Sequence, residues 1–222
     1  NQDRSTVEGL NAALTTAAGV AAKIALDLIL LAQTEVAEVA EGRGKGRSST
    51  MPQKRNPVGS TLARASARLA AGQAAVLIGS LEQEHERAAG AWQAEWAALT
   101  GALAHTGGAL HALAGALESL EVDSARMRKN LDLTGGLVMA ERVALLLTDR
   151  LGRAEAQELV REAAAFETTF RDALLADPRA GLDAAELDAA LDPCTYLGSS
   201  DGLVDRALAF YESSRRTNEV DA

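Results

Sequence analysis

The sequence predicts an all-α protein, in which a bundle of long helices is followed by a smaller helical C-terminal domain. Three observations support this prediction. Ala and Leu dominate, runs of β-branched residues are missing, and only four prolines interrupt the 222 residues. Apolar residues also recur at three- and four-residue spacing over stretches longer than most globular helices.

Three long helices are expected first along the chain. The first covers about residues 7–39, the second 58–81 and the third 88–120. A long helix cannot cover its own apolar stripe, so the three are expected to pack side by side. The expected apolar positions of the first two helices are Leu10, Leu14, Ala17, Ala21, Ile24, Leu28 and Leu31, then Leu62, Leu69, Ala70, Val76 and Leu77.

A domain boundary is expected near residue 120, which gives domains of 1–120 and 121–222. Asp123 can cap a short helix that carries Met127 and Leu131. Beyond the glycines at 135 and 136, shorter helices are expected at about 137–149, 153–175, 183–191 and 200–215. Asp183 with Glu186 resembles a capping box, and Ser200 is a second helix-start signal.

Composition narrows the possible functions. A net charge of −9 and a pI near 4.9 argue against a nucleic-acid partner. The lone Cys194 cannot form an internal disulfide, and the three histidines lack metal-ligand spacing. Lys23 and Asp27 interrupt the most apolar stretch, which argues against a membrane span. We expect a cytoplasmic protein without metal or membrane contact.

The segment 42–57 interrupts the helical pattern with glycines and prolines. Its Gly44-Lys45 pair lacks the flanking residues of a phosphate-binding P-loop. By composition alone the segment could be a flexible linker. However, it contains hydroxyls, an amide and a dense basic run, which together favour a site for a small anion. The basic residues are Arg43, Lys45, Arg47, Lys54 and Arg55.

The stretch Arg47-Ser-Ser-Thr-Met-Pro-Gln-Lys-Arg-Asn-Pro57 resembles the signature G-S-S-x-M-P-x-K-x-N-P of the fumarase/aspartase superfamily. Every named position matches except the first, where Arg47 replaces a glycine that tolerates positive φ at no cost. Residues 84–96 and 192–198 resemble the 3-carboxy-cis,cis-muconate cycloisomerases, a family within that superfamily. Residues 127–141 resemble both these enzymes and adenylosuccinate lyases. The superfamily's N-terminal half has no counterpart here.

The resemblance implies cofactor-free conversion of 3-carboxy-cis,cis-muconate to 4-carboxymuconolactone through an aci-carboxylate, in the protocatechuate branch of the β-ketoadipate pathway. It makes Ser48 the catalytic residue that exchanges a carbon-bound proton. It also implies a homotetramer with sites shared between subunits, so one chain would be incomplete. Arg55 could steer the anionic substrate. The implied substrate-binding residues are Ser49, Thr50, Lys54 and Asn56.

Three alternatives remain open from the sequence. One is adenylosuccinate lyase or another lyase of the same superfamily, which the absent N-terminal half would distinguish. Another is a catalytically silent structural member, as among lens crystallins, or an inactive fragment. The third is a plain helical interaction module, which would leave the residues of the signature segment unexplained.

Overall fold

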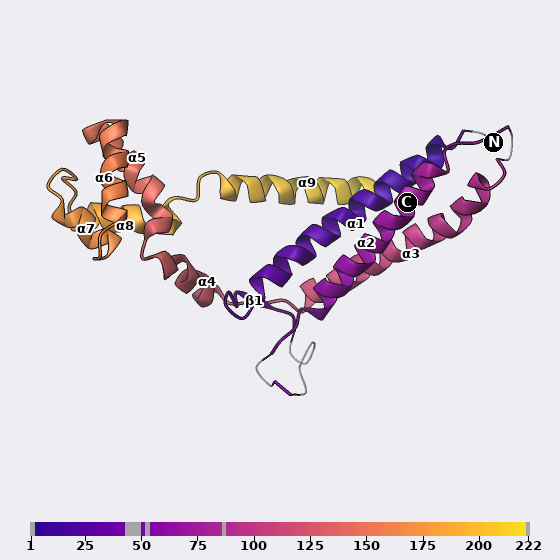
Figure 1. The fold of residues 1–222 in the computed structure, drawn as a ribbon, viewed down its shortest axis with the longest axis horizontal. Helices are drawn as coiled ribbons and strands as arrows, with labels where there is room; N and C mark the ends of the chain where they lie inside the picture. The colour runs from indigo at the N-terminus through magenta and orange to yellow at the C-terminus, as the bar shows by residue number, and fades with distance from the viewer. Residues whose placement is uncertain (1–2, 43–49, 52–53, 86–87, 221–222) are drawn as a thin grey trace. The chain divides into compact units, whose positions relative to one another are not determined.

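The computed structural model describes residues 3–42, 50–51, 54–85 and 88–220. Its contacts divide the chain into two compact units, Asn1–Met127 and Arg128–Ala222. The described residues are overwhelmingly helical (Figure 1), so the predicted all-α class is confirmed.

Three long helices form the first unit: α1 (Ser5–Leu31), α2 (Val58–Gly79) and α3 (Ala91–Glu118). They pack side by side, and α2 lies against both of the others (Figure 1). By length and composition alone α1 could cross a membrane, a property that it shares with core helices of soluble proteins. Here its inner face packs into the bundle.

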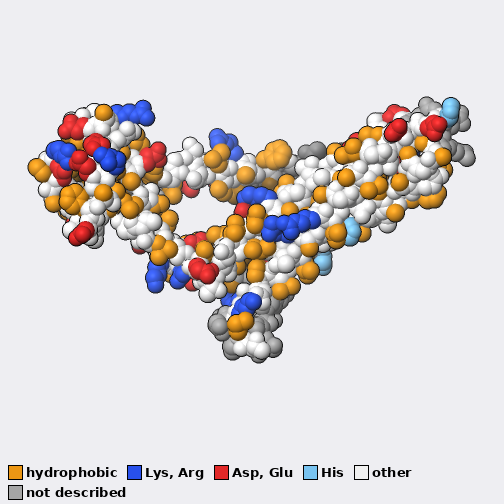
Figure 2. Space-filling model, in the orientation of Figure 1, with side chains coloured by type: hydrophobic (Ala, Val, Ile, Leu, Met, Phe, Trp, Pro, Cys, Tyr) orange, Lys and Arg blue, Asp and Glu red, His pale blue; other side chains and the backbone are white. Residues whose placement is uncertain are grey.

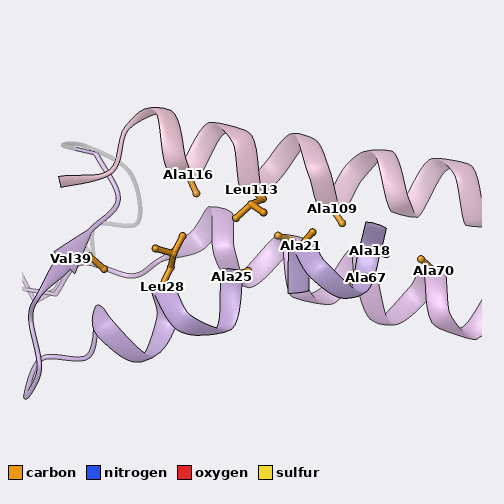
Figure 3. Packing of buried hydrophobic residues seen from close by; sticks show 11 residues of the cluster. Ala18, Ala21, Ala25, Leu28, Val39, Ala67, Ala70, Ala109, Leu113 and Ala116 are labelled. Atoms are coloured by element: carbon orange, nitrogen blue, oxygen red, sulfur yellow. The ribbon is translucent and has the colours of Figure 1, made fainter. Parts of the chain in front are cut away.

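The interior of the bundle is built mainly from alanines (Figure 3). The larger apolar side chains of α2 mostly point outward: Leu62 and Leu69 are 55% and 53% exposed, whereas Leu77 is 2% exposed. The predicted apolar face of this helix was therefore wrong for Leu62, Leu69 and Val76, and in α1 the prediction was wrong for Leu10, which is also exposed. Small side chains let helices approach closely, so the alanine stripe faces the neighbouring helices. Figure 2 shows hydrophobic side chains along the outer surface of these helices.

α1 ends at Leu31 rather than near residue 39, because the chain turns back toward the end of α3. The Glu38 N–H donates to the Leu31 carbonyl, and β1 (Val39–Ala40) then pairs antiparallel with β2 (Glu121–Val122). β2 thus belongs to the first unit, and the units divide after Met127 instead of at residue 120.

The link between the units begins with α4 (Ser124–Leu131). As predicted, the Asp123 carboxylate caps this helix by accepting from the Arg126 N–H at 2.9 Å. Two short 3₁₀ helices follow, η1 (Asp132–Thr134) and η2 (Leu137–Met139), separated by Gly135 and Gly136 with positive φ.

The second unit contains α5 (Ala140–Leu151), α6 (Arg153–Ala164), α7 (Phe170–Ala176), α8 (Ala184–Leu191), η3 (Pro193–Thr195) and α9 (Ser200–Val220). The single helix predicted over 153–175 is two helices, because Thr169 adopts an extended backbone and caps α7. The Asp183–Glu186 capping box and the helix start at Ser200 are confirmed. Large side chains fill the core of this unit, including Val143, Leu147, Leu159, Phe170, Leu174 and Leu187.

Candidate active site

The predicted site residues lie on the connection between β1 and α2. Ser48 and Ser49 fall outside the described residues, as does Arg47. Thr50 and Lys54 are exposed, and Asn56 is half-buried two residues before α2 begins. The Lys54 N–H donates to the Met51 carbonyl at 3.0 Å, and the Asn56 carbonyl accepts from the Val58 N–H at 2.9 Å. The structure therefore places Lys54 and Asn56 together at the entrance to α2.

The N-terminus of α2 is capped from the other end of the connection. Pro57 occupies the N-cap position and offers no side-chain hydrogen bond. Instead, the Glu41 carboxylate accepts from the Gly59 N–H at 2.8 Å, the Ser60 N–H at 2.8 Å and the Ser60 hydroxyl at 2.7 Å. Glu41 is only 5% exposed. A buried carboxylate beside the positive end of a helix is stabilised both by these donors and by the helix dipole.

The Arg55 side chain makes hydrogen bonds to other residues of the chain. Its guanidinium donates to the Glu41 carbonyl at 2.9 Å and to the Glu121 carboxylate at 3.0 Å. Both side chains of this ion pair are more than a third exposed, so the pair contributes little to stability. Arg55 thus connects the segment to β2, and the expectation that it steers the substrate stays a prediction.

Two hollows border this region. A partly open cavity of about 500 Å³ is lined by Thr34, Glu41, Arg55, Glu121 and Asp123, among others. A second, of about 460 Å³, lies between α2 and α3 and is lined by Glu41, Gly59 and His111, among others. Among the described residues that line these two hollows, Arg55 is the only Lys or Arg.

In the described part of the chain, no group of three or more His, Cys, Asp or Glu side chains is placed to hold a metal ion. What the region offers is hydrogen-bond donors and a lysine ammonium beside a helix start. Such groups bind carboxylates and stabilise negative charge that develops on them.

Sequence reasoning missed Glu41, Ser119 and Glu121. Their roles depend on partners far along the chain, such as Ser119 Oγ, which accepts from the Gly42 N–H at 3.4 Å. Glu41 ends a run with glutamates at 35, 38 and 41, and nothing local distinguishes it from the other two. The only available signal was the proline at the start of α2, which leaves that helix without a local cap.

Two family models match the chain. The model described as Lyase matches residues 2–72, which include the signature segment. The model described as Adenylosuccinate lyase C-terminus matches residues 136–207 in the second unit. The two matches fall on different units, so the similarity is not confined to one motif.

Curated relatives carry several named activities, among them nitrosuccinate lyase and 3-carboxy-cis,cis-muconate cycloisomerase. A nitrosuccinate lyase of Streptomyces davaonensis is 46% identical over 213 residues, which is 92% of this chain and 45% of that protein. A 3-carboxy-cis,cis-muconate cycloisomerase of Pseudomonas aeruginosa is 46% identical over 200 residues, which is 86% of this chain and 44% of that protein. The chain spans about half the length of the curated relatives that it matches.

Among solved structures, the 3-carboxy-cis,cis-muconate lactonizing enzyme from Pseudomonas putida matches with a TM-score of 0.87 and 38% identity, over 96% of this chain and 48% of that one. A fumarate lyase from Mesorhizobium matches with a TM-score of 0.83 and 31% identity, over 93% and 47%. The same helical arrangement thus recurs across both units. The chain belongs to the fumarase/aspartase superfamily of lyases, and within it resembles the 3-carboxy-cis,cis-muconate cycloisomerases.

Proposed function

We propose that the complete enzyme to which this chain contributes is a 3-carboxy-cis,cis-muconate cycloisomerase that forms 4-carboxymuconolactone. One observation carries the proposal: a nearly complete signature segment between β1 and α2, in a chain that matches cycloisomerases along most of its length. The reaction would be a step in the protocatechuate branch of the β-ketoadipate pathway.

The reaction is an isomerisation, so no group leaves. One substrate carboxylate oxygen forms a bond to a carbon of the conjugated diene and closes the lactone ring. The displaced electron pair moves to the carbon beside another carboxylate, which holds it as an aci-carboxylate. A proton then adds to that carbon. The difficult part is proton transfer at carbon, which needs a positioned acid/base group and donors directed at the carboxylate.

The signature residues divide this work. Ser48 exchanges the proton at carbon, and a serine hydroxyl can do so only when nearby donors and positive charge activate it. Lys54 pairs with a substrate carboxylate and Asn56 hydrogen-bonds to it, which fits their common position at the entrance to α2. Ser49 and Thr50 add hydroxyl or backbone donors.

The same proposal includes a homo-oligomer, a tetramer with sites shared between subunits. Leu62, Leu69 and Leu110 on α2 and α3 are about half exposed within the single chain. Gly72 and Gly107 lie inside these helices with nothing within 4 Å of the position of a Cβ. Glycine inside a helix costs about 1 kcal/mol relative to alanine. A second copy approaching closely at these positions would account for both features.

A second candidate function follows from the similarity to the nitrosuccinate lyase of Streptomyces davaonensis. Removal of nitrous acid from nitrosuccinate would break a C–N bond and a C–H bond and leave a butenedioate. That reaction needs the same proton transfer beside a carboxylate, so the signature residues fit it equally well. The two candidates differ in whether a group leaves.

The two candidates are separated by assaying the full-length enzyme with both compounds. Cycloisomerase activity consumes the muconate diene absorbance, whereas the lyase activity releases nitrite. We expect loss of the diene absorbance without nitrite release. Nitrite release from nitrosuccinate with no consumption of the muconate would reject the first proposal in favour of the second.

Replacement of Ser48 tests the assigned chemistry. Ser48→Ala should lower kcat by about 10²–10⁴-fold while substrate still binds, because an acid/base group is lost. Lys54→Ala should raise KM as well as lower kcat, since an unpaired carboxylate weakens the ground state and the transition state alike. Ser199→Ala, at an exposed position in the second unit, is the control. Retention of a tenth of the wild-type kcat by Ser48→Ala would refute the assignment.

A further inference from the structure

Glu41 stands outside the signature segment, yet its side chain is hydrogen-bonded to the start of α2. Its buried carboxylate accepts three hydrogen bonds of 2.7–2.8 Å from Gly59 and Ser60. Charge-assisted hydrogen bonds of this length are about twice as strong as neutral ones. These bonds span 18 and 19 positions along the chain, so the carboxylate links the beginning of the segment to its end.

The backbone at Gly59 and at Gly42 is packed closely against neighbouring residues. A Cβ at Gly59 would lie 3.1 Å from the Ala116 Cβ and 3.2 Å from both the Ala112 carbonyl and a Glu41 carboxylate oxygen. A Cβ at Gly42 would lie only 2.7 Å from the Ser119 Cβ. A side chain at Gly42 would therefore force Ser119 to shift, and one at Gly59 would press tightly against α3 and Glu41. The two ends of the segment are held against the same end of α3.

From this geometry we infer that Glu41 is a positioning residue, which fixes Lys54 and Asn56 relative to the bundle by anchoring the start of α2. The inference rests on the proposed substrate-binding role of these two residues. The Glu41 carboxylate is buried and hydrogen-bonded to Gly59 and Ser60, so the proposed role acts through the start of α2. Its effect reaches the substrate through the backbone, where only two residues separate Asn56 from Gly59.

The alternative to this role is a helix cap that adds stability and nothing else. The two differ in how Glu41 and Lys54 interact when both are changed. Mutations of residues that act through one another give non-additive effects, whereas independent effects multiply. A double-mutant comparison in the full-length enzyme therefore separates positioning from general stabilisation.

The test compares Glu41→Gln with the wild-type enzyme and in a Lys54→Ala background. Gln keeps the size of the side chain but places an amide donor opposite a buried N–H donor. We expect kcat/KM for the muconate to fall at least about tenfold in the wild-type background, and less than about threefold in the Lys54→Ala background. Equal losses in the two backgrounds, or a lowered melting temperature without a loss in kcat/KM, would overturn the inference.

Two further variants complete the experiment. Ser60→Ala removes one of the three hydrogen bonds and should give a smaller loss in the same direction, so the inference remains testable if Glu41→Gln does not fold. Glu35→Gln makes the same chemical change at an exposed glutamate before β1 and should leave kcat/KM within about twofold of wild type. No loss in Ser60→Ala and Glu41→Gln alike would refute the role.

Hydrogen exchange keeps this inference separate from the proposed reaction. In Glu41→Gln the Gly59 and Ser60 amides should exchange faster, because their acceptor is weakened, and Glu35→Gln should leave them unchanged. This measurement needs no substrate. Faster exchange in an enzyme that does not consume the muconate would reject the proposed substrate but keep the anchor. Unchanged exchange would reject the anchor whatever the enzyme converts.

Discussion

The three-helix bundle of the first unit and helices α5–α8 of the second unit place their large apolar side chains in opposite ways. In the three-helix bundle of the first unit, alanines fill the interior, and leucines such as Leu62 and Leu69 face outward. In α5–α8 of the second unit, Leu147, Leu159 and Leu174 are at most 1% exposed and form an ordinary core. Helices α5–α8 thus bury most of their own large apolar residues, whereas α9 (Ser200–Val220) leaves Leu203, Leu208 and Phe210 exposed. The bundle of the first unit leaves leucines exposed along its helices.

Ion pairs join separate elements in both units: Arg55 pairs with Glu121 in the first, and Arg150 with Glu186 and Arg171 with Asp188 in the second. The exposed leucines differ more clearly, because they recur along the helices of the first unit, whereas among the leucines described in α5–α8 only Leu145 is exposed. Rows of exposed leucine beside open glycines suit a protein neighbour. The proposed assembly would therefore use the three-helix bundle, while α5–α8 have a core of their own.

Replacing outward leucines with charge should have the largest effect. Leu62 and Leu69 are about half exposed, so the proposed assembly would gain about 1.5–3 kcal/mol from burying the rest of both side chains. Replacing both with Asp removes this gain and adds a penalty of several kcal/mol for each buried, unpaired charge. At 1.4 kcal/mol per factor of ten, dissociation constants should rise more than about a hundredfold, with loss of activity. Sedimentation of the full-length enzyme measures the assembly. Leu145→Asp, at a 50% exposed leucine of the second unit, should leave it intact.

An unchanged sedimentation profile in the double variant would contradict the proposal that the outward leucines of the bundle form an assembly surface. The outward leucines would then be tolerated exposure on a bundle that is stable by itself. A dissociated Leu145→Asp control would contradict the comparison of the two units instead, since it would place an assembly surface on the second unit as well.

The spacing of apolar residues predicted the long helices but could not show which face of each helix is buried. In α2 the stripe containing Ala63, Ala67 and Ala70 runs beside that of Leu62 and Leu69, and both have helical spacing. Because leucine is larger and more apolar than alanine, the leucine stripe was predicted to be the buried face. The structure buries the alanines, because the close approach of three helices favours small side chains. That choice depends on the neighbours, which one helix's own pattern does not reveal.

The end of α1 was missed for a related reason. Residues 32–38 keep a helix-favouring composition, and the turn there depends on pairing with Glu121 and Val122 far along the chain. In the candidate site, the distinctive order of residues identified Lys54 and Asn56 by resemblance. Glu41 escaped notice because its partners follow it by 18 and 19 positions. Most short-range patterns were read correctly, apart from the Thr169 cap that divides residues 153–175, and contacts between distant segments were not predicted.

A cavity in the second unit should have the next largest effect. Leu147 is fully buried, so Leu147→Ala should destabilise that unit by about 2–5 kcal/mol through lost burial and the space left behind. Leu145→Ala, two residues earlier on the same helix and 50% exposed, should cost much less. Denaturant unfolding of the full-length enzyme, followed by hydrogen exchange in residues 140–191, measures both. Equal costs at the two positions would show that the second unit lacks the packed core assigned to it.

The smallest expected effect concerns the ion pair between α7 and α8. Arg171 donates to Asp188 through Nε at 2.6 Å and Nη2 at 3.0 Å, and this holds the pKa of the Asp188 carboxyl below its ordinary value. A carboxyl with a lowered folded pKa adds stability above its unfolded pKa of about 3.9, and that stability is lost as the pH falls through the folded pKa.

Asp188→Asn should therefore lower the melting temperature slightly at pH 7, and the difference should vanish in acid below the folded pKa. Both side chains are exposed, so screening by salt should also shrink the difference. Asp149→Asn, at an exposed position on α5, is the matched control, and melting curves from pH 7 down to acid compare the two. If the difference in melting temperature grew on acidification, its sign would be opposite to that expected for this ion pair. The pair would then not contribute to the stability of the second unit.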